Sequence, residues 1–177
     1  MFGAGPPDDF LQLAPVTSDI STVPYHELKQ SFDDLGELEA GAVTSRSEFF
    51  RRSLPDQAIA ALLEDLEPGR ELNFTPMGGA YNRVPATATA FAHRSERFMI
   101  EHVSADANWV HRSWSAVHHH ASGRVYPNFP DPHLEDPLIA YHGENLARLK
   151  EIKTHYDPAG LLRFPQCLRP EVRSSRR

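Results

Sequence analysis

Tyr126 and Asn128 are the side chains whose types and spacing best suit shared chemistry in this sequence. They lie in the run 125–129, VYPNF, where Pro127 and Pro130 bias the residues before them away from helical backbone angles. We therefore expect an extended segment, in which residues two apart point to the same face. A phenol and an amide on one face can hydrogen-bond one ligand, although a tyrosine on a strand more often only packs.

Histidines offer a second kind of chemistry, metal binding. The sequence has ten of them, including the consecutive His118, His119 and His120, with His93, His102 and His111 nearby. On a strand only the first and third of the consecutive histidines would share a face, and on a helix none would stack on another. No His-Glu-x-x-His pattern, cysteine pair or carboxylate at zinc-like spacing accompanies them. We therefore expect a solvated polar cluster and no metal site.

Phosphate binding and nucleophilic hydrolysis are both disfavoured. The Gly78-Gly79 pair lacks the Gly-x-Gly-x-x-Gly pattern and the Lys-Ser/Thr ending of phosphate-binding loops, so we expect a plain turn. No Gly-x-Ser-x-Gly elbow is present, and the single cysteine, Cys167, stands in a proline-flanked tail, which argues against an activated serine or cysteine. One cysteine excludes an intramolecular disulfide, is expected as a buried free thiol, and is compatible with the cytosol.

The residues before position 104 predict one helix and two strands. The helix is expected to begin at Ser53 as N-cap, with Pro55 and Asp56 in a capping-box-like first turn, and to end at Pro68-Gly69. Two short apolar runs, 72–77 and 97–103, are predicted strands. The helix would bury one face made of Ile59, Leu62, Leu63 and Leu66.

Two further helices are predicted in the second half of the chain. Asp106 would cap the first, which ends near His118 and carries an apolar stripe of Ala107, Val110, Trp114 and Val117. The second would span residues 137–156, with Leu138, Tyr141, Leu149, Ile152 and Tyr156 on its buried side. Strands and helices mixed without βαβ alternation favour an α+β fold, an antiparallel β-sheet flanked by helices.

Length and charge limit the partners. A chain of 177 residues suits one domain with its own core. The net charge of -6 disfavours nucleic acid, despite a basic tail at residues 173–177. No signal-peptide pattern and no apolar stretch of about 18 residues is present, so we expect no membrane association and a cytoplasmic location. Residues 1–24, with four prolines, predict a loop-like lead-in or a strand cut off from its partners.

Four stretches, in this order, resemble the C-terminal part of berberine-bridge-enzyme-like oxidases, FAD-linked enzymes of the vanillyl-alcohol-oxidase superfamily. They are VPYHELKQSFD (23–33), NFTPMGGAYNRVPATATAFAHR (73–94), VYPNFPD (125–131) and AYHGENLARLKEIKTHYDPAGLLRFPQCL (140–168). The last contains the family's Tyr-x-Gly-x-Asn and Tyr-Asp-Pro motifs. Ordered agreement over most of residues 23–168 makes this resemblance specific.

The resemblance implies three segments with different roles along the chain. Residues 1–122 would be part of a substrate-binding domain built on an antiparallel sheet. Residues 123–168 would be a C-terminal strand-helix segment that completes a separate FAD-binding domain, and residues 169–177 a basic tail. FAD is the implied cofactor, and a small molecule bearing a hydroxyl or amine is the implied substrate. The family's main FAD-binding domain has no counterpart in this sequence, so we expect FAD binding to need that domain or a partner chain that carries it.

The family's Tyr-x-Asn motif falls on Tyr126 and Asn128. The resemblance implies that Tyr126 is a general base, which removes a proton from a substrate hydroxyl while hydride passes to the flavin. It implies that Asn128 hydrogen-bonds the flavin or orders the tyrosine. Asn145 and Tyr141, from the Tyr-x-Gly-x-Asn motif, are expected near the cofactor, although Tyr141 could simply pack its helix.

His93 and Arg94 match the family's Phe-Pro-His-Arg and are expected on the substrate-domain wall, although Arg94 could equally hold a structural ion pair. Two substitutions depart from the family. Ala92 replaces a proline, and Pro127 occupies the middle of Tyr-x-Asn, where it would remove a ladder hydrogen bond and favour an edge strand. Two hypotheses follow: half of an FAD-linked oxidase, or a non-catalytic remnant that binds small molecules or proteins.

Overall fold

The computed structural model describes residues 11–12, 14, 20–33, 43–164 and 166–169. The chain divides into two units, residues 1–41 and 42–177, which are described separately. In the first unit, residues 20–24 have neither helix nor strand, and α2 follows at Tyr25–Asp33. Most of the predicted lead-in, and the basic tail from position 170, lie outside the described residues. The domain boundary expected near residue 122 falls inside the second unit and stays a prediction.

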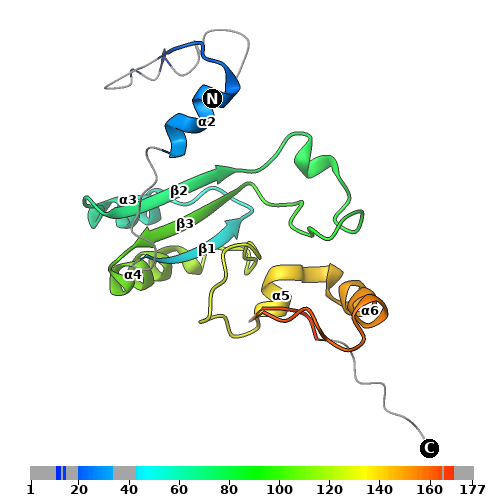
Figure 1. Cartoon of the computed structure of the whole chain (residues 1–177). Coiled ribbons are helices and arrows are strands. Elements are labelled where there is room, and N and C mark those ends of the chain that lie inside the picture. Colours follow the sequence, from blue (N-terminus) through cyan, green and yellow to red (C-terminus); the bar gives the residue numbers. More distant parts are fainter. Residues whose placement is uncertain (1–10, 13, 15–19, 34–42, 165, 170–177) are drawn as a thin grey trace, which may run out of the picture. The chain divides into compact units, whose positions relative to one another are not determined.

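The second unit is built on a three-stranded antiparallel sheet in the order β1-β3-β2 (Figure 1). The strands are β1 (Thr44–Phe50), β2 (Arg70–Pro76) and β3 (Phe98–Ser104). Central β3 pairs with both neighbours, so that Ile100 stands opposite Glu48 on β1 and Phe74 on β2. The predicted α+β class and the two predicted strands are therefore confirmed, whereas β1 was not predicted.

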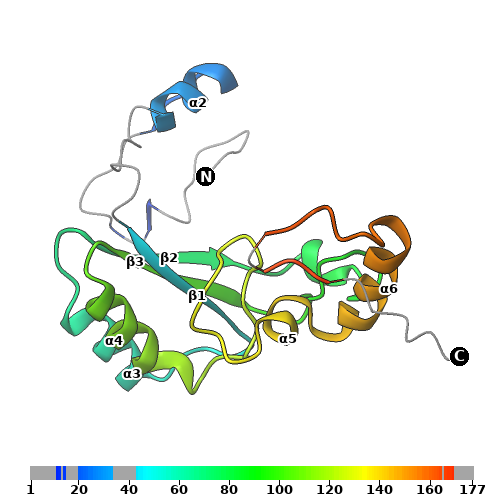
Figure 2. The same cartoon turned by 60° about the horizontal axis from the view of Figure 1, so that its bottom comes forward.

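Helices α3 (Asp56–Glu64) and α4 (Ala107–His118) lie together over one face of this sheet (Figure 2). Between the helices and the sheet lies a core of apolar side chains that are less than a tenth exposed. Its members are Phe50, Leu54, Ala58, Leu62, Ile100 and Val117. Strand and helix thus cover each other's apolar faces, which is the arrangement expected of a layered α+β unit.

The start of α3 differs from the prediction. Pro55, not Ser53, is its N-cap, and no side chain caps the helix. The Ser53 hydroxyl instead accepts a hydrogen bond from Arg97 Nη1 at 2.8 Å. The helix also ends at Glu64, before Leu66. Ile59, Leu63 and Leu66 are all 40% exposed or more.

The predicted start of α4 is confirmed, because the Asp106 carboxylate accepts hydrogen bonds from the backbone N–H groups of Asn108 and Trp109. Its buried stripe is wider than predicted. Trp109 and Ser113 are buried beside Val110 and Val117, whereas Ala107 is exposed. Ser113 is buried because its hydroxyl lies 2.9 Å from His102 Nδ1 on β3, a partner that helical periodicity cannot show.

The C-terminal part of the second unit contains three short helices. They are α5 (Pro137–His142), η2 (Gly143–Asn145) and α6 (Leu146–Tyr156). The single helix predicted over 137–156 is therefore wrong, since Gly143 has a φ of +52° and breaks it. Ile152 and Tyr156, predicted to be buried, are 38% and 79% exposed. Ala140 and Tyr141 form a small core with Val125.

Candidate active-site turn

Tyr126 and Asn128 do meet, but through a turn. The backbone N–H of Phe129 donates to the Tyr126 carbonyl at 3.0 Å, which closes a four-residue β-turn. Within it, Asn128 Nδ2 donates to the Tyr126 hydroxyl oxygen at 2.9 Å. The extended segment predicted over 125–129 is therefore wrong. Pro127 takes the second turn position, where its fixed φ is favourable, so no ladder hydrogen bond is lost.

Both ends of this turn are anchored in buried structure. At one end, Val125 is 1% exposed and its N–H donates to the Ala140 carbonyl of α5 at 3.1 Å. At the other end, Asp131 is 3% exposed, and its Oδ2 lies 2.8 Å from Arg46 Nε on β1. The turn residues between these anchors are partly or fully exposed. Fixed ends and an open middle allow the phenol and amide to face a ligand.

Aromatic side chains surround the ring of Tyr126. Phe129 lies at a centroid distance of 5.2 Å, Phe91 at 6.1 Å and Phe49 at 6.5 Å, all in edge-to-face geometry. Such pairs stabilise by about 0.5–1.5 kcal/mol beyond burial. The ring is therefore held in place, while its hydroxyl remains available to Asn128.

His93 is almost fully enclosed, at 3% exposure. Its Nε2 lies 2.8 Å from the Tyr141 carbonyl, to which the ring N–H donates. Phe49 packs against the ring at 4.8 Å. Burial lowers the pKa of His93 to about 4, so the imidazole is neutral at pH 7. In this chain His93 joins the sheet unit to α5, and its predicted contact with substrate stays a prediction.

Arg94 organises the loop that precedes it. Its Nη2 donates to Thr89 Oγ1 at 2.9 Å, and its Nη1 and Nε donate to the carbonyls of Tyr81 and Phe91. Its guanidinium also lies 4.6 Å from the Tyr81 ring centre. None of the ion pairs among the described residues includes Arg94, so the alternative role in an ion pair is not seen there. Its predicted contact with substrate is untested.

Tyr141 and Asn145, both predicted near the cofactor, are buried. The Tyr141 hydroxyl accepts a hydrogen bond from the Asp131 backbone N–H at 2.8 Å, and burial raises the pKa of this phenol. Asn145 Nδ2 donates to the carbonyls of Ala86 and Thr89 at 2.8 and 3.0 Å. Asn145 thereby ties the loop ordered by Arg94 to η2. Cofactor contact by either residue stays a prediction.

A buried polar network beside the turn was missed by sequence reasoning. Arg46 and Glu48 share with Phe50 the face of β1 that α4 covers. Both charged side chains are at most 5% exposed. Glu48 Oε1 lies 2.7 Å from His118 Nδ1, while its Oε2 has no partner among the described residues. Burial, its largest cause, raises the pKa of Glu48 to about 8. Two charged residues on one face of a strand normally indicate that this face is exposed to solvent. For this reason the sequence predicted neither β1 nor the network.

The consecutive histidines are largely solvated, as predicted, because His118 and His119 are exposed and His120 is half-buried. His118, besides its contact with Glu48, stacks on Trp114 at 4.0 Å, and the rings of His119 and His120 lie 3.8 Å apart. Among the described residues, no group of three or more His, Cys, Asp or Glu side chains is arranged to hold a metal ion.

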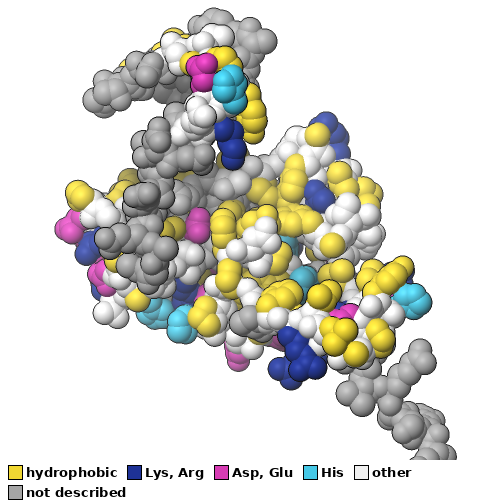
Figure 3. Space-filling view, in the orientation of Figure 1, with side chains coloured by type: hydrophobic (Ala, Val, Ile, Leu, Met, Phe, Trp, Pro, Cys, Tyr) yellow, Lys and Arg dark blue, Asp and Glu magenta, His cyan; other side chains and the backbone are white. Residues whose placement is uncertain are grey.

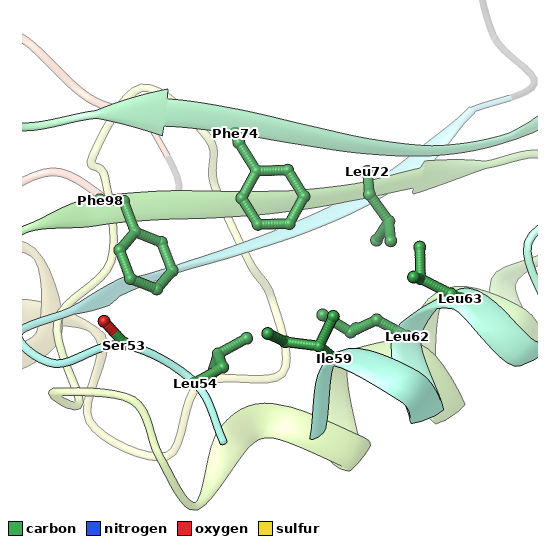
Figure 4. Close-up of a pocket in the computed structure, with 8 residues that line it drawn as sticks. All are labelled: Ser53, Leu54, Ile59, Leu62, Leu63, Leu72, Phe74 and Phe98. Carbon is green, nitrogen blue, oxygen red and sulfur yellow. The ribbon is translucent and has the colours of Figure 1, made fainter. Parts of the chain in front are cut away.

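A groove of about 290 Å³ lies between α3 and β2, away from the turn (Figure 4). It is lined by Ser53, Leu54, Ile59, Leu62, Leu63, Leu72, Phe74 and Phe98. Only Ser53 contributes a polar side chain, so the groove has no convergent polar groups of the kind that fix a reacting ligand.

The C-terminal part of the chain matches a known protein family. Residues 125–169, which begin one residue before Tyr126, match the family model described as berberine and berberine like. The FAD-linked oxidoreductase YgaK of Bacillus subtilis is 26% identical over 174 residues, covering 91% of this chain. YvdP, another FAD-linked oxidoreductase of Bacillus subtilis, is 36% identical over 130 residues, covering 65%. The relatives are thus FAD-linked oxidoreductases. The chain spans 38% and 28% of their respective lengths.

Solved structures of berberine-bridge-enzyme-like proteins are similar to this chain. Physcomitrella patens BBE-like 1, in a variant form, superposes with a TM-score of 0.66 at 26% identity, over 73% of this chain and 31% of that protein. Berberine bridge enzyme from Eschscholzia californica superposes with a TM-score of 0.71 at 22% identity, over 81% of this chain and 36% of that protein, and shares the fold. The segment 125–169 thus matches the berberine and berberine like family, and the larger part of the chain is similar to proteins of that kind.

The Tyr126–Asn128 turn presents polar groups on its open side. The exposed amide of Asn128 and the partly exposed phenol of Tyr126 offer donor and acceptor groups without an enclosing cavity of their own. Gly78 and Gly79 have positive φ angles, but they form the plain turn that the sequence predicts. A phosphate cradle is not evident among the described residues. Within the described residues, no helix combines the length and apolar character required to cross a membrane.

Proposed function

We propose that this chain supplies the substrate side of an FAD-linked oxidoreductase site, in which Tyr126 takes a proton from a hydroxyl-bearing small molecule. The observation that carries the proposal is the contact between Asn128 Nδ2 and the Tyr126 hydroxyl, on an exposed turn in the segment that matches the family. Relatives named carbohydrate oxidase, from Microdochium nivale, and chitooligosaccharide oxidase, from Gibberella zeae, support a sugar hydroxyl as the group oxidised. FAD is the cofactor that the FAD-linked relatives support.

The chemistry divides between chain and cofactor. Oxidation of an alcohol to a carbonyl removes the hydroxyl proton and a hydride from carbon. Bound FAD supplies the acceptor for the hydride. The chain's part is to place the Tyr126 oxygen at the substrate hydroxyl, so that the phenolate accepts the proton as the carbonyl forms. Asn128 stabilises that phenolate, because its amide already donates to the same oxygen.

An exposed apolar surface supports association with a flavin-binding part. Yellow side chains gather around α5 and α6 in Figure 3. The exposed residues there, and in the segment after α6, are Ile139, Ile152, Tyr156, Leu161, Leu162 and Phe164. Exposed apolar side chains gathered in one region favour an interaction site, and its occupant in this proposal is the FAD-binding domain, from the same protein or a partner chain.

The test is a spectroscopic titration of the full chain with FAD, in the absence and presence of a flavin-binding part from the same protein or its genomic neighbour. We expect no tightly bound flavin for the chain alone. We expect a bound flavin, bleached by carbohydrate substrates, once the two parts combine. A combined protein that binds flavin but is never reduced by any hydroxyl-bearing substrate would instead favour a non-catalytic binding module.

A further inference from the structure

A buried ion pair joins the C-terminal end of the turn that carries Tyr126 to the sheet, while backbone hydrogen bonds with Phe49 hold the chain before the turn. Arg46 on β1 and Asp131 on the C-terminal segment are 5% and 1% exposed in their side chains, with 2.8 Å between Nε and Oδ2. Asp131 lies five residues after Tyr126. Its backbone N–H is held by Tyr141, and its Oδ1 accepts the N–H of His133. Charge-assisted hydrogen bonds in buried surroundings are strong and directional, so this pair fixes where the turn ends.

Arg46 is itself held in a defined position. Its guanidinium carbon lies 3.5 Å from the centre of the Trp114 ring on α4, and its Nη1 lies 3.3 Å from His111 Nδ1. Helix, strand and C-terminal segment therefore meet at one guanidinium. A change in the partner of Arg46 would be transmitted directly to Asp131.

Glu48 is the group that can change that partner. It stands two residues from Arg46 on the same face of β1, is 2% exposed, and interacts electrostatically with both Arg46 and Asp131. Its Oε2 is buried without a partner among the described residues. When Glu48 carries a proton, Arg46 faces one carboxylate. When Glu48 is ionised, Arg46 faces two.

The titratable and charged groups around Arg46 and Glu48 come from every element packed there. They are His102 on β3, His111 and His118 on α4, and Asp131 on the C-terminal segment. Burial lowers the pKa of His102 to about 4 and also lowers that of His118. These two imidazoles are therefore neutral at pH 8, where Glu48 loses its proton.

We propose that the Arg46–Asp131 ion pair is a positioning latch for the Tyr126–Asn128 turn, and that ionised Glu48 loosens the latch by competing with Asp131 for Arg46. Arg46, Asp131 and Glu48 are positioning residues that never touch substrate. The inference rests on the proposed function for Tyr126 as the base. The latch itself is a property of the chain that can be measured without catalysis.

The first experiment measures amide hydrogen exchange of Phe129 and Val125 in the full chain, one pH unit below and one pH unit above pH 8, relative to intrinsic exchange rates. We expect the wild type to lose protection at the higher pH, on the order of tenfold. Glu48→Gln, which cannot ionise, retains its protection.

The latch is removed by the double variant Arg46→Met with Asp131→Asn. Methionine keeps contact with Trp114, asparagine keeps an acceptor for His133, and neither member of the ion pair is left as a lone buried charge. We expect weak protection of the turn at both pH values. The matched control is Arg148→Met with Glu151→Gln, which removes an ion pair whose side chains are 73% and 65% exposed, and it should behave as the wild type does.

The second experiment measures turnover of the flavin-bound protein over the same pH range. We expect the double variant to lower kcat with KM near the wild-type value, and Glu48→Gln to extend activity above pH 8. The latch is overturned if Glu48→Gln loses protection with pH as the wild type does, or if the double variant keeps a protected turn. Its positioning role is overturned if exchange responds as expected but kcat does not. Absence of turnover in every protein, wild type included, would contradict the proposed function alone, because exchange still decides the latch.

Discussion

Glu48→Gln should remove a large part of the pH dependence of folding stability. Glu48 is 2% exposed, and burial raises its pKa from 4.5 to about 8. The folded chain therefore holds a proton on Glu48 over a range in which the unfolded chain has released it. Stability from this group is fully present below pH 4.5, falls as pH rises, and is lost by about pH 8. Glutamine resembles the protonated carboxyl in shape and can donate to His118, but does not titrate.

The magnitude follows from linkage. A tenfold difference in proton affinity between the folded and unfolded chain corresponds to about 1.4 kcal/mol, so the interval from 4.5 to about 8 amounts to on the order of 5 kcal/mol. His93 and His102 act with the opposite sign, because burial lowers their pKa values from 6.5 to about 4. Their contribution is present above pH 6.5 and is lost as pH falls toward 4. Between pH 6.5 and 8, Glu48 dominates among these three groups, with a fall of roughly 2 kcal/mol.

The assay is urea denaturation at closely spaced pH values for the wild type, Glu48→Gln, and the surface control Glu151→Gln. The free energy of unfolding should fall from pH 6.5 to 8 in the wild type and in the control, and should stay nearly level in Glu48→Gln. Equal slopes in all three proteins would show that Glu48 is already ionised in the folded chain, and would refute the reasoning.

Three further substitutions test other parts of the structure. Asn128→Ala removes the donor to the Tyr126 oxygen, and should lower kcat of the flavin-bound protein about tenfold without changing the unfolding free energy. Asn145→Ala leaves the Thr89 carbonyl without its partner, and should cost about 1–3 kcal/mol in urea denaturation and speed proteolysis of the loop before Arg94. Gly143→Ala forces a side chain into a φ of +52°, and should lower the unfolding free energy by about 1–2 kcal/mol.

Local signals in the sequence predicted local structure well. The Asp106 cap is confirmed. Its carboxylate binds backbone N–H groups two and three residues later, and this contact does not depend on where the helix packs. The runs that became β2 and β3 were found because each is short, contains several apolar residues and is bounded by turn residues. The break at Gly143 was missed, since helical periodicity continues on both sides of a single left-handed glycine.

The features that the sequence did not predict depend on contacts between residues distant along the chain. Strand β1 was missed because Arg46 and Glu48 are polar in sequence, and only Asp131 and His118, distant along the chain, make their burial possible. The Tyr126–Asn128 pair was predicted for an incorrect geometric reason, since a turn closed by Phe129 and not strand alternation brings the two together. Asn145 carried a family motif, but its partners in the loop before Arg94 could be seen only in three dimensions.

The most direct test of the central claim is the rate of flavin reduction by a carbohydrate substrate, measured anaerobically in the flavin-bound protein with Tyr126 or with Tyr126→Phe. The substitution keeps the ring packed against Phe49, Phe91 and Phe129 and removes only the hydroxyl. We expect reduction to slow by about 10²–10⁴-fold with little change in substrate affinity. An unchanged rate of reduction would contradict Tyr126 as the base.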